Sequence, residues 1–305
     1  MDTKYKVKTA VAVVIFNRVD KAKTLYGVLK KVQPSRLYVI ADGPRNEEET
    51  EKCMQTRMIF ENIEWPCEIS RNYSEKNMGC CMRPQTGFTW VLENESEAIF
   101  LEDDCIPCVE FFRFCDEMLE RYRNDTRIMQ IAGTNYLTEW TSNGYSYHFA
   151  RWGSIWGWAT WARAWNLYDV EIKTWKDPSV KAIVRQNLGE KVFKTREGVY
   201  NKICCNSSNI SAWDHQWSYC RLINNGLTVV PSVNLVTNIG SGEDATHTTN
   251  MGNTSIEIKS LEFPLQHPPY IMRDVEFDQE IERKIFDIIP LWKKTVRKIK
   301  RMLTK

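Results

Sequence analysis

The sequence predicts an α/β fold in which helices cover both faces of a mostly parallel sheet. The chain has 305 residues, of which 43% are hydrophobic and 26% are charged, an ordinary composition for a globular protein with a sizeable core. In its first half, short apolar runs typical of buried strands alternate with segments long enough for helices. Strands joined in this way pair in parallel through right-handed crossovers. We therefore expect one continuous domain built on such a sheet.

Strand and helix patterns follow one another from residue 10 to residue 132. Most of the expected strands are runs of apolar residues, and polar or turn-forming residues separate them from the helices. Asp20 is a residue type that caps helices, and Asp42-Gly43-Pro44 is a turn sequence. Strands are expected at residues 10–16, 37–41, 68–72, 98–101 and 128–132, and helices at 20–31, 47–63, 79–92 and 109–122.

Polar residues follow three of these strands at the point where each strand ends. The carboxyl ends of parallel strands meet at one edge of a sheet, and ligands of such sheets bind beyond that edge. We therefore expect these residues to lie in one pocket. They are Asn17 and Arg18 after the first strand, Asp42 and Gly43 after the second, and Glu102, Asp103 and Asp104 after the fourth.

The acidic triplet Glu102-Asp103-Asp104 is the most informative of these motifs. Three neighbouring carboxylates repel one another and lose hydration when buried, so we expect a positive group beside them. Mg²⁺ and Mn²⁺ prefer carboxylate oxygens and usually keep water or phosphate oxygens as further ligands. A solvated acidic turn is the alternative interpretation of an isolated triplet.

The second half of the chain is rich in tryptophan. Seven of these residues lie between positions 140 and 175. Trp161 and Trp165 have helical spacing and are expected in the core. Trp156 and Trp158 are flanked by glycines, and two interpretations stay open for them: packing, or stacking against the apolar face of a sugar ring.

The strand-end segments VVIFNR, VIADGP and FLEDDCIP, with KNMGC between them, resemble the nucleotide-sugar half of a GT-A fold glycosyltransferase. The resemblance is to a bacterial family 2-like group related to the N-acetylglucosaminyltransferase of N-glycans, which has a Glu-Asp-Asp version of the DxD motif. The segments SIWGWATWARAW, SAWDHQWSY and NIGSGEDATHT look like the acceptor half of the bacterial group. The resemblance spans residues 8–250. It implies a Rossmann-like donor half at 1–133 and an acceptor and catalytic half at 134–280.

Roles on the donor side follow from this resemblance. It implies that Asn17 and Arg18 line the nucleotide and that Asp42 bonds the base, uracil in a UDP-sugar. Glu102 would contact the donor sugar or ribose. The remaining donor contacts that the resemblance implies are Gly43, Asn77, Gly79 and Asp103.

Metal and catalytic roles follow in the same way. The resemblance implies a divalent cation, Mn²⁺ or Mg²⁺, with Asp104 as its direct ligand. His247 follows the small-residue loop at 240–242 and is expected to complete the metal shell or to bind the diphosphate. The resemblance implies that Asp214 is the general base, with a helix-capping aspartate as the alternative. His215 is either structural or an acceptor contact, and Trp156 and Trp158 are the other expected acceptor contacts.

The expected function is transfer of one sugar from a nucleotide sugar to a glycan or lipid-linked acceptor, with inversion. A Gln-x-x-Arg-Trp signature is absent from the sequence, so processive polymer synthesis is not expected. A sugar-phosphate nucleotidylyltransferase is one alternative, but residues 16–20 lack the glycines of a phosphate-binding loop. A non-catalytic sugar-binding protein on a transferase scaffold is the other.

Charge is unevenly distributed along the chain. The net charge of +2 favours no nucleic-acid partner. Residues 291–305 carry seven basic side chains and no acidic one. Apolar residues at three- and four-residue intervals predict a basic amphipathic helix at 281–305, which either docks on the body or contacts an anionic membrane. Without a signal-peptide pattern or an apolar span, we expect a cytoplasmic protein, peripheral on the inner face of the membrane if the tail binds there.

Overall fold

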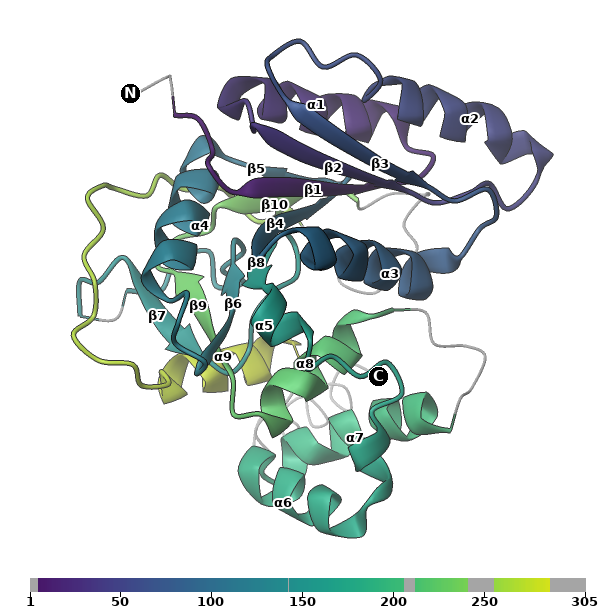
Figure 1. Cartoon of the computed structure of the whole chain (residues 1–305). Coiled ribbons are helices and arrows are strands. Elements are labelled where there is room, and N and C mark those ends of the chain that lie inside the picture. The colour runs from purple at the N-terminus through teal and green to yellow at the C-terminus, as the bar shows by residue number, and fades with distance from the viewer. Residues whose placement is uncertain (1–4, 142, 206–211, 241–254, 286–305) are drawn as a thin grey trace, which may run out of the picture.

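The computed structural model describes residues 5–141, 143–205, 212–240 and 255–285, and an eight-stranded sheet lies at its centre (Figure 1). The strands of this sheet are β1 (Ala10–Ile15), β2 (Arg36–Ala41), β3 (Glu68–Tyr73), β4 (Glu97–Glu102), β6 (Ile128–Ala132), β7 (Tyr147–Ala150), β8 (Trp158–Trp161) and β9 (Leu227–Pro231). Their order is β3-β2-β1-β4-β8-β6-β9-β7. Parallel pairing joins β3, β2, β1 and β4, and also β6 and β9, whereas β8 and β7 run antiparallel to their neighbours. The expected α/β fold with a mostly parallel sheet is confirmed.

Helices cover both faces of the sheet (Figure 1). They are α1 (Val19–Val32), α2 (Glu47–Met58), α3 (Gly79–Asn94), α4 (Val109–Arg121), α5 (Ala162–Trp165) and α8 (Asp214–Ile223). Val11, Val13 and Ile15 of β1 pack in one core cluster with α1 and α4. Ala10 and Ala12 of the same strand pack in another cluster with α3, α5 and α8. A strand buried on both faces needs apolar residues at consecutive positions, which explains the uninterrupted apolar run of β1.

A further group of helices continues the fold below the sheet in Figure 1. It consists of the 3₁₀ helix η1 (Lys173–Lys176), α6 (Pro178–Leu188), α7 (Glu190–Cys204) and α9 (Val275–Ile285). Trp175, Phe193 and Ile281 from these helices share a core cluster with Ala150 of β7 and Val230 of β9. The helices are therefore joined to the sheet by a common core, as expected for a single continuous domain.

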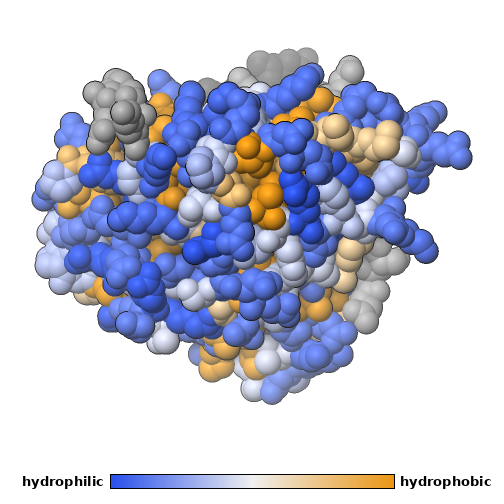
Figure 2. Space-filling view, turned by 45° about the horizontal axis from the view of Figure 1, so that its top comes forward, coloured by the Kyte–Doolittle hydropathy of each residue, from blue (hydrophilic) through white to orange (hydrophobic). Residues whose placement is uncertain are grey.

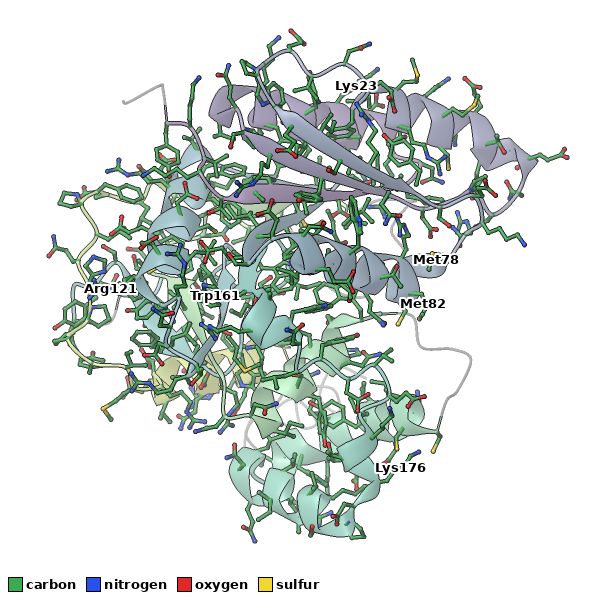
Figure 3. The ribbon with its side chains drawn as sticks, viewed as in Figure 1. Lys23, Met78, Met82, Arg121, Trp161 and Lys176 are labelled. Atoms are coloured by element: carbon green, nitrogen blue, oxygen red, sulfur yellow. The ribbon has the colours of Figure 1, made fainter. Side chains whose placement is uncertain are left out.

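The tryptophan-rich segment forms a strand and a short helix. β8 lies between β4 and β6 and pairs antiparallel with both, an insertion that the sequence did not predict. Trp161 ends β8 and Trp165 ends α5, so their spacing of four does not come from one helix. Both side chains are buried, and the Trp161 indole donates to the Leu119 carbonyl of α4 at 3.2 Å (Figure 3). Their expected core packing is confirmed.

The second helix ends five residues earlier than expected. α2 stops at Met58, which is 64% exposed. Phe60 and Trp65 then turn inward, and their rings lie 5.8 and 5.6 Å from that of Tyr26 on α1. The helix therefore ends at Met58, and the chain beyond it turns so that both aromatic residues are buried.

The C-terminal helix also differs from the expectation. α9 begins at Val275, before the expected start of the tail at residue 281. Ile281 is 1% exposed and belongs to the core cluster of the helices below the sheet. The first turns of the expected tail therefore dock on the body. Residues 286–305, the rest of that tail, lie outside the described residues.

Hydrophilic side chains dominate the face of the molecule that Figure 2 shows, with apolar side chains in separate small patches. Across the four described ranges, each helix is too short or too polar to cross a bilayer. A second, two-stranded sheet pairs β5 (Cys105–Pro107) with β10 (Val236–Asn238) directly after the acidic triplet. This small sheet brings residues after position 236 beside the acidic triplet.

Candidate active site

The three polar strand ends lie at one edge of the sheet. Val14 of β1 is in register with Glu102 of β4, and Ile15 is in register with Ala41 of β2. The Asp103 amide donates to the Val14 carbonyl at 3.0 Å, and the Asp42 amide donates to the Ile15 carbonyl at 3.2 Å. The loops after β1, β2 and β4 are therefore adjacent, as the sequence predicts. Arg18, Glu102 and Asp104 line a pocket at this edge, whereas the other residues expected there do not line it, namely Asn17, Asp42, Gly43 and Asp103.

Arg18 supplies positive charge beside the acidic triplet. Its Nη1 donates to Asp103 Oδ1 at 3.1 Å and to Asp104 Oδ2 at 2.7 Å. One guanidinium does not balance three carboxylates. Burial raises the pKa of Asp103 to about 6, and burial with repulsion from Asp104 and Asp103 raises the pKa of Glu102 to about 8. The triplet thus favours an additional cation.

The acidic triplet fits a divalent cation whose ligand shell is completed by phosphate and water. Asp104 and Glu102 line the same pocket, and Asn238 Nδ2 lies 3.4 Å from Asp104 Oδ1. Within the described ranges, no group of three or more His, Cys, Asp or Glu side chains is placed to hold a metal ion, so the protein would supply at most one or two carboxylates. Mg²⁺ and Mn²⁺ bind at sites with one or two carboxylates plus substrate phosphates. His247, the other expected ligand, lies outside the described residues.

Gly240 lies against the carboxylate of Asp104. A Cβ atom at this position would lie 2.2 Å from Asp104 Oδ2, so a larger residue cannot be accommodated without moving the carboxylate. The Gly240 amide donates to Asn238 Oδ1 at 2.6 Å, and the Ile239 amide donates to the Asp104 carbonyl at 2.9 Å. The segment that follows β10 therefore positions Asp104, a contact that the sequence did not reveal.

Asp42 fixes the turn before α3. Its Oδ1 accepts from the amides of Gly43 at 2.9 Å and Met78 at 2.8 Å. Its Oδ2 accepts from the Gly79 amide at 2.9 Å and from Asn77 Nδ2 at 3.1 Å. Four hydrogen bonds from the protein already occupy this buried carboxylate. We therefore revise the expected role of Asp42 from direct contact with the base to positioning the turn at residues 77–79.

Asn17 is held in a similar way. Its Nδ2 donates to Glu49 Oε1 at 3.0 Å, and Glu49 in turn pairs with Arg45. The Asn17 side chain is half-buried and lies beside Arg18 at the start of α1. Asn17 therefore lies at the expected strand end, and its side-chain nitrogen is hydrogen-bonded to Glu49.

A pocket of about 630 Å³ joins the strand ends to α7, α8 and α9. Asp214, the first residue of α8, lines this pocket together with Glu102 and Asp104. Its side chain is 33% exposed, and Trp213, not Asp214, occupies the N-cap position of α8. A carboxylate in the first turn of a helix is stabilised by the helix dipole. The structure thus brings the expected base and the acidic triplet into one cavity.

The two glycine-flanked tryptophans have different environments. Trp156 is half-buried, lines the pocket and has its ring 5.5 Å from that of Tyr136. Trp158 is 1% exposed and stacks between Phe100 at 5.0 Å and Trp213 at 5.3 Å. Trp158 therefore packs in the core and cannot contact an acceptor, which corrects that expectation.

His215 follows Asp214 on α8 and lines the same pocket. Its Nδ1 lies 3.8 Å from Asp214 Oδ2 and 3.5 Å from an Nη atom of Arg196. The sequence did not single out several other pocket residues, because they come from distant helices and loops without a local motif. They are Tyr136, Trp152, Arg196, Arg221 and Asn238.

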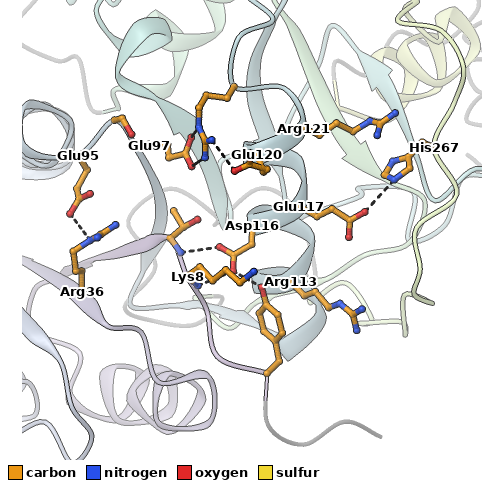
Figure 4. A pocket seen from close by; sticks show the side chains of 14 residues that line it. Lys8, Arg36, Glu95, Glu97, Arg113, Asp116, Glu117, Glu120, Arg121 and His267 are labelled. Atoms are coloured by element: carbon orange, nitrogen blue, oxygen red, sulfur yellow. Dashed lines mark hydrogen bonds and ion pairs between the residues drawn. The ribbon is translucent and has the colours of Figure 1, made fainter.

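A larger cavity, of about 1020 Å³, lies at the other end of the sheet, where β1, β2 and β4 begin (Figure 4). Its acidic side chains are paired within the protein. Arg36 contacts Glu95 at 2.9 Å, Arg123 contacts Glu97 at 2.8 Å, and His267 contacts Glu117 at 3.2 Å. Ligands of parallel sheets bind at the carboxyl ends of the strands, and this cavity is at the amino ends. We therefore assign the smaller pocket as the candidate active site.

No protein-family model and no curated protein sequence matches the chain. Two solved structures of the galactosyltransferase LgtC are similar to it. One, in complex with donor and acceptor sugar analogs, has 9% identity and a TM-score of 0.30 over 52% of this chain and 60% of that chain. The other, an active-site mutant, has 10% identity and a TM-score of 0.36 over 72% of each chain. At these identities and scores the similarity assigns no activity.

Proposed function

We propose that this chain is a metal-dependent GT-A glycosyltransferase that moves one sugar from a nucleotide sugar, UDP-linked, to a glycan or lipid-linked acceptor. One observation carries the proposal. The strand-end carboxylates Glu102 and Asp104 line the same aromatic-walled pocket of about 630 Å³ as Asp214. A cation-binding group and a base are the two aids that this reaction needs, and they face one cavity.

On the donor side, Asp104 would hold Mn²⁺ or Mg²⁺. When bound, the cation neutralises charge on the diphosphate leaving group. Arg18 keeps a guanidinium beside the same carboxylates and lines the pocket, so it adds positive charge where the leaving group develops negative charge. Asp42 and Asn77 hold the adjacent turn in place. Glu102 also lines the pocket and would contact the donor sugar.

On the acceptor side, Asp214 accepts the proton of the attacking hydroxyl. Its partly exposed carboxylate lies at the helix start within the pocket, where a hydroxyl can approach it. Trp156 and Tyr136 offer aromatic surface for the apolar face of a sugar ring. Direct attack by the deprotonated hydroxyl inverts the anomeric carbon.

The connection from β1 to α1 argues against the nucleotidylyltransferase alternative. It consists of residues 16–18, Phe-Asn-Arg, and has no glycine to cradle a phosphate. The sugar-binding alternative differs from a transferase in turnover alone. Hydrolysis of the nucleotide sugar by the isolated protein in Mn²⁺ would separate them.

The test combines binding and turnover. UDP-, GDP- and dTDP-sugars are screened for Mn²⁺-dependent stabilisation of the full chain, since a ligand of the native state raises the melting temperature. We expect stabilisation by a UDP-sugar, loss of that effect in EDTA, and loss of metal-dependent turnover in Asp104→Asn. Asp125→Asn is the matched control and should behave as the unmodified chain. Asp125 forms an ion pair with Arg127 just before β6. Full Mn²⁺-dependent turnover in Asp104→Asn would disprove the metal assignment.

We also propose that the protein works in the cytoplasm at an anionic membrane surface, where a lipid-linked acceptor would lie. The seven basic residues of 291–305 support this proposal, because each basic residue near an anionic surface contributes about 1 kcal/mol at best. Sedimentation with phosphatidylglycerol vesicles should be salt-sensitive and should be lost when 291–305 is deleted. Equal sedimentation of both chains would exclude a role of the tail in membrane binding.

A further inference from the structure

A buried guanidinium forms part of the wall of the candidate active-site pocket. Arg221 on α8 lines the pocket and is 3% exposed. Its Nη1 donates to the Arg151 carbonyl at 3.1 Å and to the Thr228 hydroxyl. Its Nε has no hydrogen-bond partner in the described part of the chain. Burying a charged donor without a partner is costly, so this group calls for an explanation.

No carboxylate pairs with Arg221 among the described residues. Asp278 on α9 acts on it electrostatically, but this carboxylate is engaged elsewhere. It accepts from the amides of Arg151 at 3.1 Å and Trp152 at 3.2 Å, and lies 3.3 Å from Arg273 Nε. Burial lowers the pKa of Arg221 to about 10, so the side chain is still cationic at neutral pH. The protein thus leaves this buried charge without an ion-pair partner in the described ranges.

A second arginine lines the same side of the pocket. The guanidinium of Arg196 on α7 lies 5.1 Å from the ring centre of Trp152. Burial is the main cause of the lowered pKa of Arg221, and the positive charge of Arg196 lowers it further. Arg196 and Arg221 repel each other electrostatically, and an anion bound in the pocket would reduce that repulsion. Arg side chains bind carboxylate and phosphate groups through charge-assisted hydrogen bonds.

The pocket is therefore lined by charges of both signs. Glu102 and Asp104 come from the end of β4, and Arg196, Asp214 and Arg221 come from α7 and α8. We propose that the acceptor carries an oxyanion, a phosphate or a sugar carboxylate, which binds Arg221 and Arg196 while its sugar ring lies against the pocket's tryptophans. This inference rests on the proposed glycosyltransferase function, because it names the acceptor class of that same site.

Calorimetric titration of the full chain in EDTA tests this inference. Glucose 6-phosphate and glucuronate are the anionic probes, and glucose is the uncharged reference. We expect at least about tenfold tighter binding of one anionic probe than of glucose, the scale of one charge-assisted hydrogen bond. The probe that binds distinguishes a phosphate from a carboxylate. In a second titration with Mn²⁺ in place of EDTA, so that UDP can bind, binding of the anion should persist, because the anion is expected at α7 and α8 and the donor at the end of β4.

Arginine variants locate the binding site. Arg196→Gln and Arg221→Gln should reduce the anion preference about tenfold or more, whereas Arg185→Gln, a 51% exposed arginine on α6, should leave it unchanged. If Arg221→Gln does not fold, Arg221→Lys replaces it, because Lys keeps the positive charge but lacks the planar set of guanidinium donors. Arg196→Gln remains as the second variant. Equal binding of glucose and both anions, displacement of the anion by UDP, or an unchanged preference in the arginine variants would overturn the inference.

The outcomes also separate this inference from the proposed function. If UDP binds with Mn²⁺ but no anion is preferred over glucose, the transferase proposal stands and the acceptor inference fails. If an anion binds at the arginines but no nucleotide sugar binds, the transferase proposal fails.

Discussion

The two ends of the sheet both carry charged cavities, but their charges are balanced differently. At the amino end, each acidic side chain that lines the cavity contacts a donor of the protein. Asp116, for example, accepts from the amides of Lys8 and Thr9 at 2.8 and 3.0 Å (Figure 4). At the carboxyl end, two carboxylates share Arg18, and Arg221 has no carboxylate partner in the described part of the chain.

This difference separates structural charge from functional charge. Ion pairs that the fold completes itself hold segments together and need no ligand. Charges that the fold leaves unbalanced in a pocket raise its free energy until a ligand of opposite charge arrives. By this criterion the smaller pocket is the functional one, although the amino-end cavity is larger. The predictions below test this distinction from the largest expected effect to the smallest.

Asp214→Asn should lower turnover by about two to four powers of ten while nucleotide binding persists. The amide keeps the shape of the side chain but cannot accept the proton of the acceptor hydroxyl. Steady-state rates and calorimetry with UDP measure the two effects. Glu120→Gln at the amino-end cavity is the control and should turn over normally. A near-normal rate in Asp214→Asn would assign the base to another residue.

Arg18→Ala should lower the free energy of unfolding in EDTA by about 3 kcal/mol, because Asp103 and Asp104 lose their counter-charge in a largely buried site. Mn²⁺ should then raise the melting temperature more in this variant than in the unmodified chain, since the cation meets uncompensated carboxylates. Thermal unfolding with and without Mn²⁺ measures both changes. A variant as stable as the unmodified chain would show that Arg18 does not balance the triplet.

His148 is a buried histidine that is uncharged at neutral pH, and His148→Phe tests how its titration affects stability. Both ring nitrogens of His148 lack partners in the described ranges, and burial lowers its pKa to about 4. The unfolded chain takes up a proton near pH 6.5 and the folded chain only near pH 4. The free energy of unfolding therefore falls by about 2–3 kcal/mol as the pH drops through this window.

His148→Phe should lose this part of the pH dependence. Urea unfolding of both chains at pH 7 and pH 4.5 measures the difference, and the other titrating groups cancel in the comparison. The same dependence in both chains would show that His148 titrates normally in the fold.

Arg123→Ala should have the smallest effect. Arg123 is 43% exposed and pairs with Glu97 and Glu120 at the amino-end cavity. Exposed ion pairs contribute less than about 1 kcal/mol, so we expect a slight loss of stability and unchanged turnover. Unfolding and rate measurements check this together. A large loss of activity would contradict the assignment of this cavity as structural.

Local patterns predicted the donor half of the fold well. β1, β2 and β4 are apolar runs that end in polar residues, and a parallel sheet brings such ends together whatever the details of its packing. Glu102 and Asp104 could thus be placed near one pocket, whereas Asp214 was assigned to it only from the resemblance to a glycosyltransferase. The hydrogen bonds of Asp42 could not be foreseen, because they depend on the exact course of the turn at residues 77–79.

The acceptor half depended more on long-range packing. Trp158 and Trp156 look alike in the sequence, but β8 pairs on both sides and turns Trp158 into the core. Arg196 and Arg221 are the single arginines of α7 and α8, and no local signal in the sequence distinguishes them from an exposed arginine such as Arg185 on α6. Their place in the pocket results from how α7 and α8 pack.

β8 also has a consequence for biosynthesis. It hydrogen-bonds to β4 through residues 97–100 and to β6 through residues 131–132, and so joins the two halves of the sheet. Until residues 158–161 have left the ribosome, β4 presents an open edge of unpaired backbone groups, a template for association with other chains. A truncated product ending near residue 133 should therefore aggregate.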